Sequence, residues 1–160
     1  SNPDLTVLVF TDYNCPYCKR LEPELQRLIK GYPNIKVVNI IVPLRQQVVA
    51  GLDTNASGFA LSVWQQAPDL FPQVHDYLME KNGMHDKASL QKIAELTDTV
   101  KWLKRHSKSE IIQQKNQQVF LELGLRGTPA ILIEDITIPG YVPYTTLEKA
   151  VQQVLLKNTP

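Results

Sequence analysis

The 160-residue sequence predicts an α/β fold in which a strand–helix–strand unit and a strand–strand–helix unit flank a block of helices. Two short apolar runs, 5–10 and 35–42, flank a helical pattern at 16–30, which is typical of a βαβ unit. From about residue 56 to 123 only helical spacing occurs. The length and a composition of 43% hydrophobic and 21% charged residues favour one globular domain over residues 1–160.

The strand–helix–strand unit opens the chain. Leu5–Phe10 and Ile35–Val42 are continuously apolar and rich in β-branched residues, as buried strands are. Between them, Leu21, Leu25 and Leu28 recur on one face of the expected helix. The links are short, so we expect the two strands to be parallel and joined by a right-handed crossover.

The central block is expected to consist of several short helices and one longer helix. In the first of them Phe59, Val63 and Trp64 form part of an apolar stripe. Asn55-Ala-Ser57 has the pattern of a glycosylation sequon, but we interpret it as the cap of this helix. Ser107–Glu110 has the form of a capping box that would begin the longer helix.

The last part of the chain returns to strands. Ala130–Ile133 and Ile136–Ile138 predict a hairpin, although its turn at Glu134-Asp135 lacks the favoured glycine. Thr145–Glu148 resembles another capping box. From Leu147 onward, apolar residues recur at helical spacing, which predicts a final amphipathic helix.

The two cysteines of the chain, Cys15 and Cys18, lie where the first strand gives way to the first helix. The N-terminus of a helix presents unpaired N–H groups and a partial positive charge, which stabilise a thiolate. Pro16 suits the first helical position. A spacing of three residues brings both thiols to the same side of the helix. The pattern predicts a redox pair, with Cys15 as the exposed attacking thiol and Cys18 as the inward resolving thiol.

Other interpretations of the cysteine pair were weighed. A zinc site needs two more ligands, and His75, His85 and His106 have no paired spacing, so we expect no metal ligands. A structural disulfide across so short a loop would remove little entropy from the unfolded chain. Because two thiolates also suit Cu(I), a copper-binding metal-tolerance module is the alternative function. A net charge of +1 gives no indication of nucleic-acid binding.

Two segments resemble those of a known family. Phe10–Lys19, with the sequence FTDYNCPYCK, is similar to the active-site segment of the DsbA-like branch of the thioredoxin superfamily, and within it of the ScsC (suppressor of copper sensitivity) group. Gly127-Thr128-Pro129, which precedes a strand, resembles the cis-proline loop of that superfamily. Pro139–Tyr144 resembles the stretch before the last helix in ScsC-like proteins. The resemblance covers nearly the whole chain and implies a thioredoxin fold with a central helical insertion.

This resemblance implies a periplasmic thiol–disulfide oxidoreductase without a cofactor, in which Cys15 and Cys18 are catalytic. The direction, oxidase or isomerase and reductase, stays open. Its partners would be cysteine-containing protein substrates and a membrane redox protein that resets the cysteine pair. The resemblance assigns substrate binding to Pro16, Tyr17, Thr128 and Pro129. It also implies a cis peptide bond between Thr128 and Pro129.

The sequence departs from the family at one position. Thioredoxin and DsbA carry a buried acid six residues before the first cysteine, whereas this chain has Val9. Asp12 is nearer to Cys15, and we expect it to be solvated. Related isomerases oligomerise through an added N-terminal segment. Because this chain begins almost directly on its first strand, we expect both that segment and a signal peptide to be absent from it.

Overall fold

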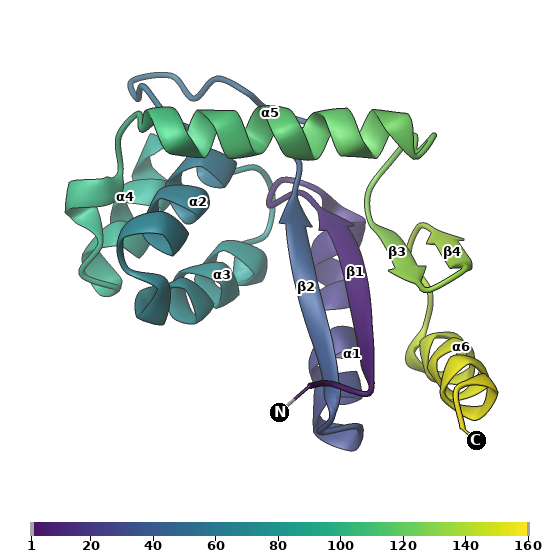
Figure 1. The fold of residues 1–160 in the computed structure, drawn as a ribbon. Coiled ribbons are helices and arrows are strands. Elements are labelled where there is room, and N and C mark those ends of the chain that lie inside the picture. The colour runs from purple at the N-terminus through teal and green to yellow at the C-terminus, as the bar shows by residue number, and fades with distance from the viewer. Residues whose placement is uncertain (1, 160) are drawn as a thin grey trace.

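The computed structural model describes residues 2–159 and arranges four strands in one sheet with the order β2-β1-β3-β4 (Figure 1). The strands are β1 (Leu5–Thr11), β2 (Ile35–Ile41), β3 (Ala130–Ile133) and β4 (Ile136–Pro139). β2 is parallel to β1, whereas β3 is antiparallel to both β1 and β4. The predicted βαβ unit and the predicted hairpin are therefore both confirmed. The hairpin turn forms without glycine because Glu134 adopts the left-handed conformation that glycine would otherwise supply, with a φ of 52°.

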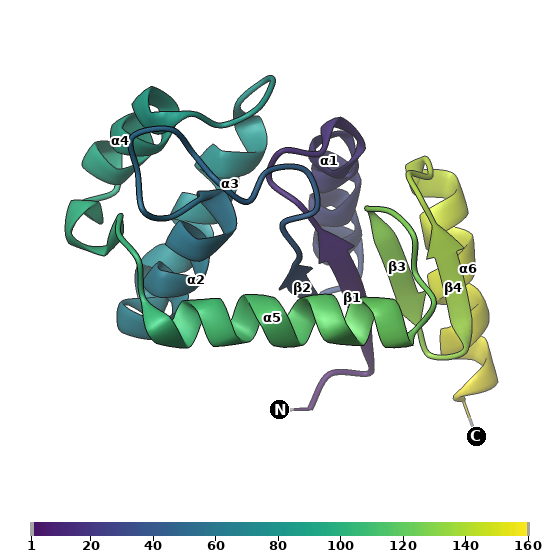
Figure 2. The ribbon, with the colours of Figure 1, turned by 90° about the horizontal axis from the view of Figure 1, so that it is seen from above.

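Helices fill the rest of the chain. Within residues 2–159 the α-helices are α1 (Pro16–Gly31), α2 (Ala56–Gln66), α3 (Phe71–Glu80), α4 (Lys87–Leu96), α5 (Ser107–Glu122) and α6 (Tyr144–Lys157), and short 3-10 turns occur at Pro68–Leu70 and Val100–Trp102. Helices α2, α3 and α4 form a group beside the sheet, and α5 extends from this group across to the strands (Figures 1 and 2). None of these helices is long and apolar enough to cross a membrane.

Two main apolar cores hold the chain together. One core lies between the sheet and helices α1 and α6, and it includes Val7, Leu21 and Leu147. The other core lies within the helical group, and it takes in the fully buried Tyr13 from the segment after β1. The active-site segment is thus part of the packing of the helical group. This arrangement allows the helices to determine how the residues around the cysteines are placed.

The start of α2 confirms the predicted cap. Asn55 lies at the N-cap position, and its side-chain oxygen accepts a hydrogen bond from the amide of Gly58 at 2.7 Å. The helix begins at Ala56, and the Asn55 side chain also donates to the carbonyl of Gln47 at 2.8 Å. Trp64, expected to point inward, is instead 50% exposed.

Both predicted capping boxes are wrong. Helix α5 begins at Ser107, so Ser107 is the first helical residue and not the N-cap. The N-cap residue is His106, and its side chain makes no capping hydrogen bond. The Glu110 carboxylate instead binds the Arg105 guanidinium, with its shorter contact at 2.7 Å. Helix α6 begins at Tyr144, one residue before the predicted cap, and Glu148 accepts hydrogen bonds from tyrosine hydroxyls. In both places the glutamate binds another side chain instead of the main chain at the start of its helix.

Replacing Asn55 should destabilise the helical group. Asn55→Ala removes the cap of α2, and such a loss costs about 1–2 kcal/mol in the free energy of unfolding. Asn55→Asp is the matched control, because its carboxylate can still accept from Gly58 but cannot donate to Gln47. Urea denaturation should show the larger loss for the alanine variant. Equal losses would mean that the contact with Gln47, and not the cap, carries the stabilisation.

Candidate active site

Cys15 occupies the N-cap position of α1, with Pro16 as the first helical residue. Its main chain is extended, with φ −91° and ψ 117°, and its amide donates to the Asp12 carbonyl at 3.0 Å. The Cys15 sulfur accepts a hydrogen bond from the amide of Cys18 at 3.3 Å. The sulfur therefore lies where the unpaired amides of the helix can stabilise a negative charge.

The Thr128–Pro129 loop lies against Cys15. In the sheet, Phe10 near the end of β1 pairs with Ala130 at the start of β3, so the segments beyond these residues meet at one edge. The Cys15 thiol donates to the Thr128 carbonyl at 3.3 Å. The Thr128–Pro129 peptide bond is cis, as the sequence pattern predicts. Residues 113 positions apart are thereby brought into direct contact.

Both cysteines are free thiols and both are buried, with Cys15 0% and Cys18 2% exposed. The prediction that Cys15 is exposed is therefore wrong, whereas Cys18 does point inward. The reason is tertiary, since the Cys15 sulfur is enclosed between the Cys18 amide and the Thr128 carbonyl. A substrate must approach this sulfur past the cis-proline loop.

The surroundings shift the pKa values of the two thiols in opposite directions. A hydrogen bond from the Cys18 side chain is the main cause that lowers the pKa of Cys15 from 9.0 to about 5. Burial by itself would raise this pKa, whereas hydrogen bonds from Thr128 and the Cys18 amide and the charge of Arg45 lower it further. Burial raises the pKa of Cys18 far above its ordinary value, so Cys18 remains a protonated donor. Near neutral pH the thiolate form of Cys15 is therefore favoured, while Cys18 stays protonated.

Asp12 is buried, only 1% exposed, and the prediction that it is solvated is wrong. Its carboxylate accepts hydrogen bonds from three main-chain amides, those of Asn14 at 2.9 Å, Leu44 at 3.0 Å and Arg45 at 2.9 Å. These donors compensate for the loss of water around the carboxylate. Asp12 therefore joins the segment before the cysteines to the loop after β2, and that loop carries the Arg45 charge.

A buried chain of hydrogen bonds connects the same segment to the helices. The Tyr13 hydroxyl lies 2.8 Å from His75 Nδ1, and His75 Nε2 lies 3.0 Å from a Glu22 carboxylate oxygen. Because a carboxylate only accepts, Nε2 donates to Glu22 and leaves Nδ1 to accept from Tyr13 in neutral histidine. Burial is the largest single influence and raises the pKa of Glu22, but the hydrogen bond and charge of His75 and the hydrogen bond from Gln26 together outweigh it and lower the pKa overall. Glu22 is thus bound to His75, and the position of the family's acid holds the buried Val9.

The loop after α3 is tied to the active-site segment at two points. The Lys19 ammonium donates to the carbonyls of Lys81 and Gly83, and burial lowers the pKa of Lys19 to about 8. The Asn14 side-chain oxygen accepts from the amide of His85 at 2.7 Å. The residues around the cysteines are therefore held by the helical group as well as by the sheet.

The surface next to the cysteines is aromatic and positively charged. Tyr17 is 55% exposed, and its ring centroid lies 6.5 Å from that of Tyr141. The Arg20 guanidinium lies over the Tyr141 ring at 4.9 Å. The sequence pattern predicts Tyr17 at this surface, but it does not predict Arg20, Arg45 and Tyr141 as neighbours of the cysteines. Arg45 had a usable signal, because it follows β2, whose carboxyl end lies beside that of the parallel strand β1.

Metal binding has little support in the geometry of the cysteine pair. Within residues 2–159, no group of three or more histidine, cysteine, aspartate and glutamate side chains is arranged to hold a metal ion. A Cu(I) ion would therefore depend on the Cys15 and Cys18 thiolates alone.

A thioredoxin fold with a thiolate at a helix N-terminus, a resolving thiol and an adjacent cis-proline defines the class of thiol–disulfide oxidoreductases. Comparison with known proteins specifies the family. Residues 6–152 match the DSBA-like thioredoxin domain, and the chain belongs to that family. This match confirms the DsbA-like thioredoxin fold and the general redox chemistry that the sequence predicted.

Individual relatives agree with this assignment. ScsC from Proteus mirabilis, in a transitional conformation, is 38% identical with a TM-score of 0.88, covering 98% of this chain and 69% of that chain. A periplasmic thioredoxin-like protein from Salmonella enterica serovar Typhimurium is 34% identical with a TM-score of 0.87, covering 98% of this chain and 87% of that chain. Disulfide bond formation protein D from Bacillus subtilis (strain 168) is 25% identical over 94% of this chain and 72% of its own length. The resemblance to the ScsC group is confirmed.

The low pKa of Cys15 should make the stability of the reduced protein depend on pH. The folded pKa, about 5, lies below the ordinary 9.0, so the stabilisation is fully present above about pH 9 and lost below about pH 5. At pH 7 it is worth on the order of 3 kcal/mol. Calorimetry should therefore show the reduced protein melting several degrees above the oxidised protein at pH 7, because the disulfide has no thiolate.

The difference in melting temperature should close as the pH approaches about 4, where the Cys15 thiol is protonated in both the folded and the unfolded chain. Cys15→Ser is the control, because its hydroxyl does not ionise in this range. An oxidised protein that melts higher at pH 7 would show that the Cys15 thiolate is not stabilised.

Proposed function

We propose that this protein is a periplasmic thiol–disulfide oxidoreductase that exchanges disulfides with cysteine-containing proteins through Cys15 and Cys18. The observation that carries the proposal is the contrast between the two thiols. Cys15 has a pKa of about 5 beside Thr128, whereas the pKa of the buried Cys18 is strongly raised. The periplasmic location is supported by the Salmonella relative, which is itself described as periplasmic.

The exchange needs no group beyond the two cysteines. In the reducing direction, the Cys15 thiolate attacks one sulfur of a substrate disulfide, and the other substrate sulfur leaves as a thiolate. Cys18 then attacks the Cys15 sulfur of the mixed disulfide, and its proton passes to the departing second substrate sulfur. The first substrate thiolate takes a proton from water, so the substrate is released as a dithiol, while the enzyme retains the Cys15–Cys18 disulfide. Oxidation of a substrate dithiol is the same sequence in reverse.

The residues around Cys15 are suited to receive an extended substrate. The main chain of Thr128 can pair with a substrate strand, since β-strand addition uses such main-chain groups. Pro16 follows Cys15 directly in the chain, Pro129 follows the Thr128 carbonyl that contacts the sulfur, and the half-exposed Tyr17 offers an apolar surface nearby. Substrate recognition would thus rest on main-chain pairing together with nonspecific apolar contact.

A stabilised Cys15 thiolate favours the reduced enzyme and makes its disulfide a strong oxidant. Its equilibrium with glutathione should therefore place the reduction potential nearer to about −120 mV than to about −270 mV, the range that such proteins span. A membrane redox partner then decides the direction. A partner that keeps the pair oxidised yields an oxidase, and one that keeps it reduced yields an isomerase or reductase.

The assay that tests the proposal compares two reactions. The oxidised protein should introduce disulfides into a reduced, unfolded substrate, and the reduced protein should accelerate the recovery of activity by scrambled ribonuclease. Cys15→Ser should abolish both reactions. A wild-type protein inactive in both assays, with its thiols intact, would refute the function.

The roles of the two cysteines can be separated by trapping. Cys18→Ala should accumulate mixed disulfides with client proteins, because the intermediate formed at Cys15 cannot be resolved. Cys15→Ala should accumulate few, because the remaining thiol is buried and protonated near neutral pH. The amount of mixed disulfide formed by each variant is compared on non-reducing gels. Equal trapping by both would mean that the roles are assigned wrongly.

A further inference from the structure

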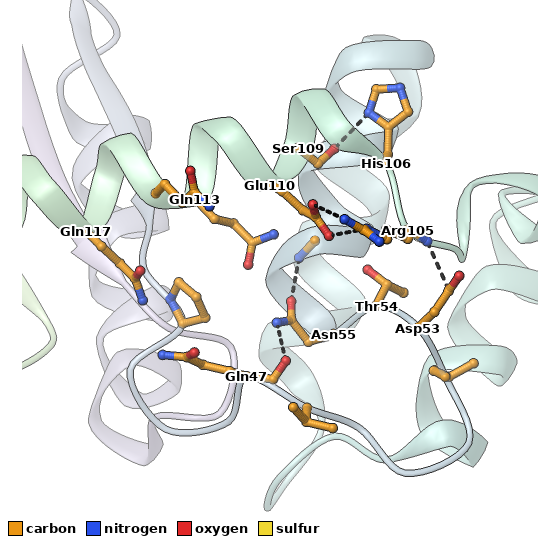
Figure 3. A pocket seen from close by; sticks show the side chains of 15 residues that line it. Gln47, Asp53, Thr54, Asn55, Arg105, His106, Ser109, Glu110, Gln113 and Gln117 are labelled. Carbon is orange, nitrogen blue, oxygen red and sulfur yellow. Dashed lines mark hydrogen bonds and ion pairs between the residues drawn. The ribbon is translucent and has the colours of Figure 1, made fainter.

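A polar cavity of about 460 Å³ lies away from the cysteine pair, between the loop after β2 and helix α5 (Figure 3). Its walls come from residues 43–58 on one side and residues 105–117 on the other. Neither cysteine lines it. The cavity therefore needs an explanation other than the thiol chemistry.

The side of α5 that faces the cavity has an unusual composition. Glu110, Gln113, Gln114 and Gln117 line it at spacings i, i+3, i+4 and i+7. This spacing normally carries the apolar residues with which a helix packs on its neighbours. Here it carries primary amides, and Figure 3 draws no interaction from Gln113 or Gln117 to the other lining residues. These amides are free to bind a ligand.

The opposite wall adds similar groups. Gln47, Thr54 and Asn55 line it. Gly58 also lines the cavity, and an added Cβ there would lie 2.5 Å from Thr54 Oγ1 and 3.2 Å from Gln113 Nε2. A glycine within a helix costs about 1 kcal/mol relative to alanine. At this position it lets the Thr54 and Gln113 side chains lie close to the main chain of α2.

The charged residues of the cavity leave a surplus of negative charge. Arg105 binds both carboxylate oxygens of Glu110, at 2.7 and 3.2 Å, and its amide donates to Asp53 at 2.9 Å. Because the Arg105 guanidinium is already bound to Glu110 and Asp53 adds a second carboxylate, an anion finds no uncompensated partner there. Among the residues of 2–159 that line the cavity there is no phenylalanine, tyrosine or tryptophan on which a sugar would stack, and the one ring is the His106 imidazole. A ligand without negative charge and rich in amide groups is the best match.

A primary amide offers donors and an acceptor, and each peptide unit of a chain offers one of each. The stripe from Glu110 to Gln117 is about 10 Å long, which equals roughly three residues of extended chain. We propose that this cavity binds an extended polypeptide segment of the unfolded client protein that carries no acidic side chains. The proposal rests on the proposed function and specifies how the client is held.

The cavity is linked to the active site through one loop. Pro43 and Gln47 line the cavity, while the residues between them contact the segment before the cysteines. Asp12 binds the amides of Leu44 and Arg45, and the Asn14 amide group donates to Gln46 at 3.2 Å. A client segment in the cavity is therefore held next to the loop that carries Arg45 beside Cys15. Binding here would raise the local concentration of client cysteines at the active site.

The test uses an unfolded client without thiols, so that mixed disulfides cannot contribute. Fluorescein-labelled ribonuclease A, reduced and carboxamidomethylated, is titrated with the reduced protein and followed by fluorescence anisotropy. The double variant Gln113→Ala/Gln117→Ala should bind about tenfold more weakly, because two hydrogen-bonding groups are removed.

Gln118→Ala is the matched control, since Gln118 is an exposed glutamine of the same helix that bonds to Glu122 and does not line the cavity. It should bind like the wild type. Affinities within about twofold for all variants, or no binding by the wild type, would overturn the proposal. Displacement of the probe by maltotriose or inorganic phosphate would also overturn it, because the ligand class would be wrong.

Exchange with glutathione disulfide separates this proposal from the proposed function. The double variant should retain the wild-type exchange rate, because a small disulfide needs only Cys15 and Cys18. If exchange is intact and client binding is insensitive to the cavity, the cavity proposal alone fails. If the wild type does not exchange with glutathione at all, the proposed function fails.

Discussion

The hydrogen bonding around the Cys15 sulfur is the interaction on which the rest of the site depends. The sulfur sits at the first turn of α1, where it contacts the Cys18 amide and the Thr128 carbonyl at 3.3 Å each. The Cys18 thiol and its amide stabilise the negative charge of Cys15 and lower its pKa to about 5. Burial keeps Cys18 protonated, and this makes it available as a donor. One environment thus lowers the pKa of one thiol and raises the pKa of the other, although the two side chains are chemically identical.

Three consecutive residues before the cysteines hold this geometry in place. Asp12 fastens the segment to the loop after β2, Tyr13 to His75 of α3, and Asn14 to His85 beyond that helix. The helical group is therefore more than an insertion beside a thioredoxin sheet. It supplies hydrogen-bond partners on the side of the active site that the sheet does not reach.

Much of the site could be predicted from the sequence because it depends on local rules. The spacing of Cys15 and Cys18, and Pro16 at the first helical position, specify the redox pair and the start of α1. Thr128 and Pro129 could be placed only through resemblance to a family. The contacts of Asp12 and Tyr13 could not be predicted, because their partners lie 33 and 62 positions away. Glu110 and Glu148 fitted local capping patterns, but their carboxylates bind the Arg105 guanidinium and the hydroxyls of Tyr32 and Tyr144 instead.

The sequence by itself determined the order of strands and helices, the redox chemistry of the cysteine pair and the fold class. Hydrophobic periodicity and helix-terminal preferences act over a few residues and are visible in the chain. Only the tertiary structure decided that Cys15 is enclosed, that Asp12 is buried and that the glutamines of α5 face a cavity. Burial and cavities depend on which distant segments pack together. The register of β1 with β3 and the crossing of α5 bring those segments together, and no local pattern encodes either.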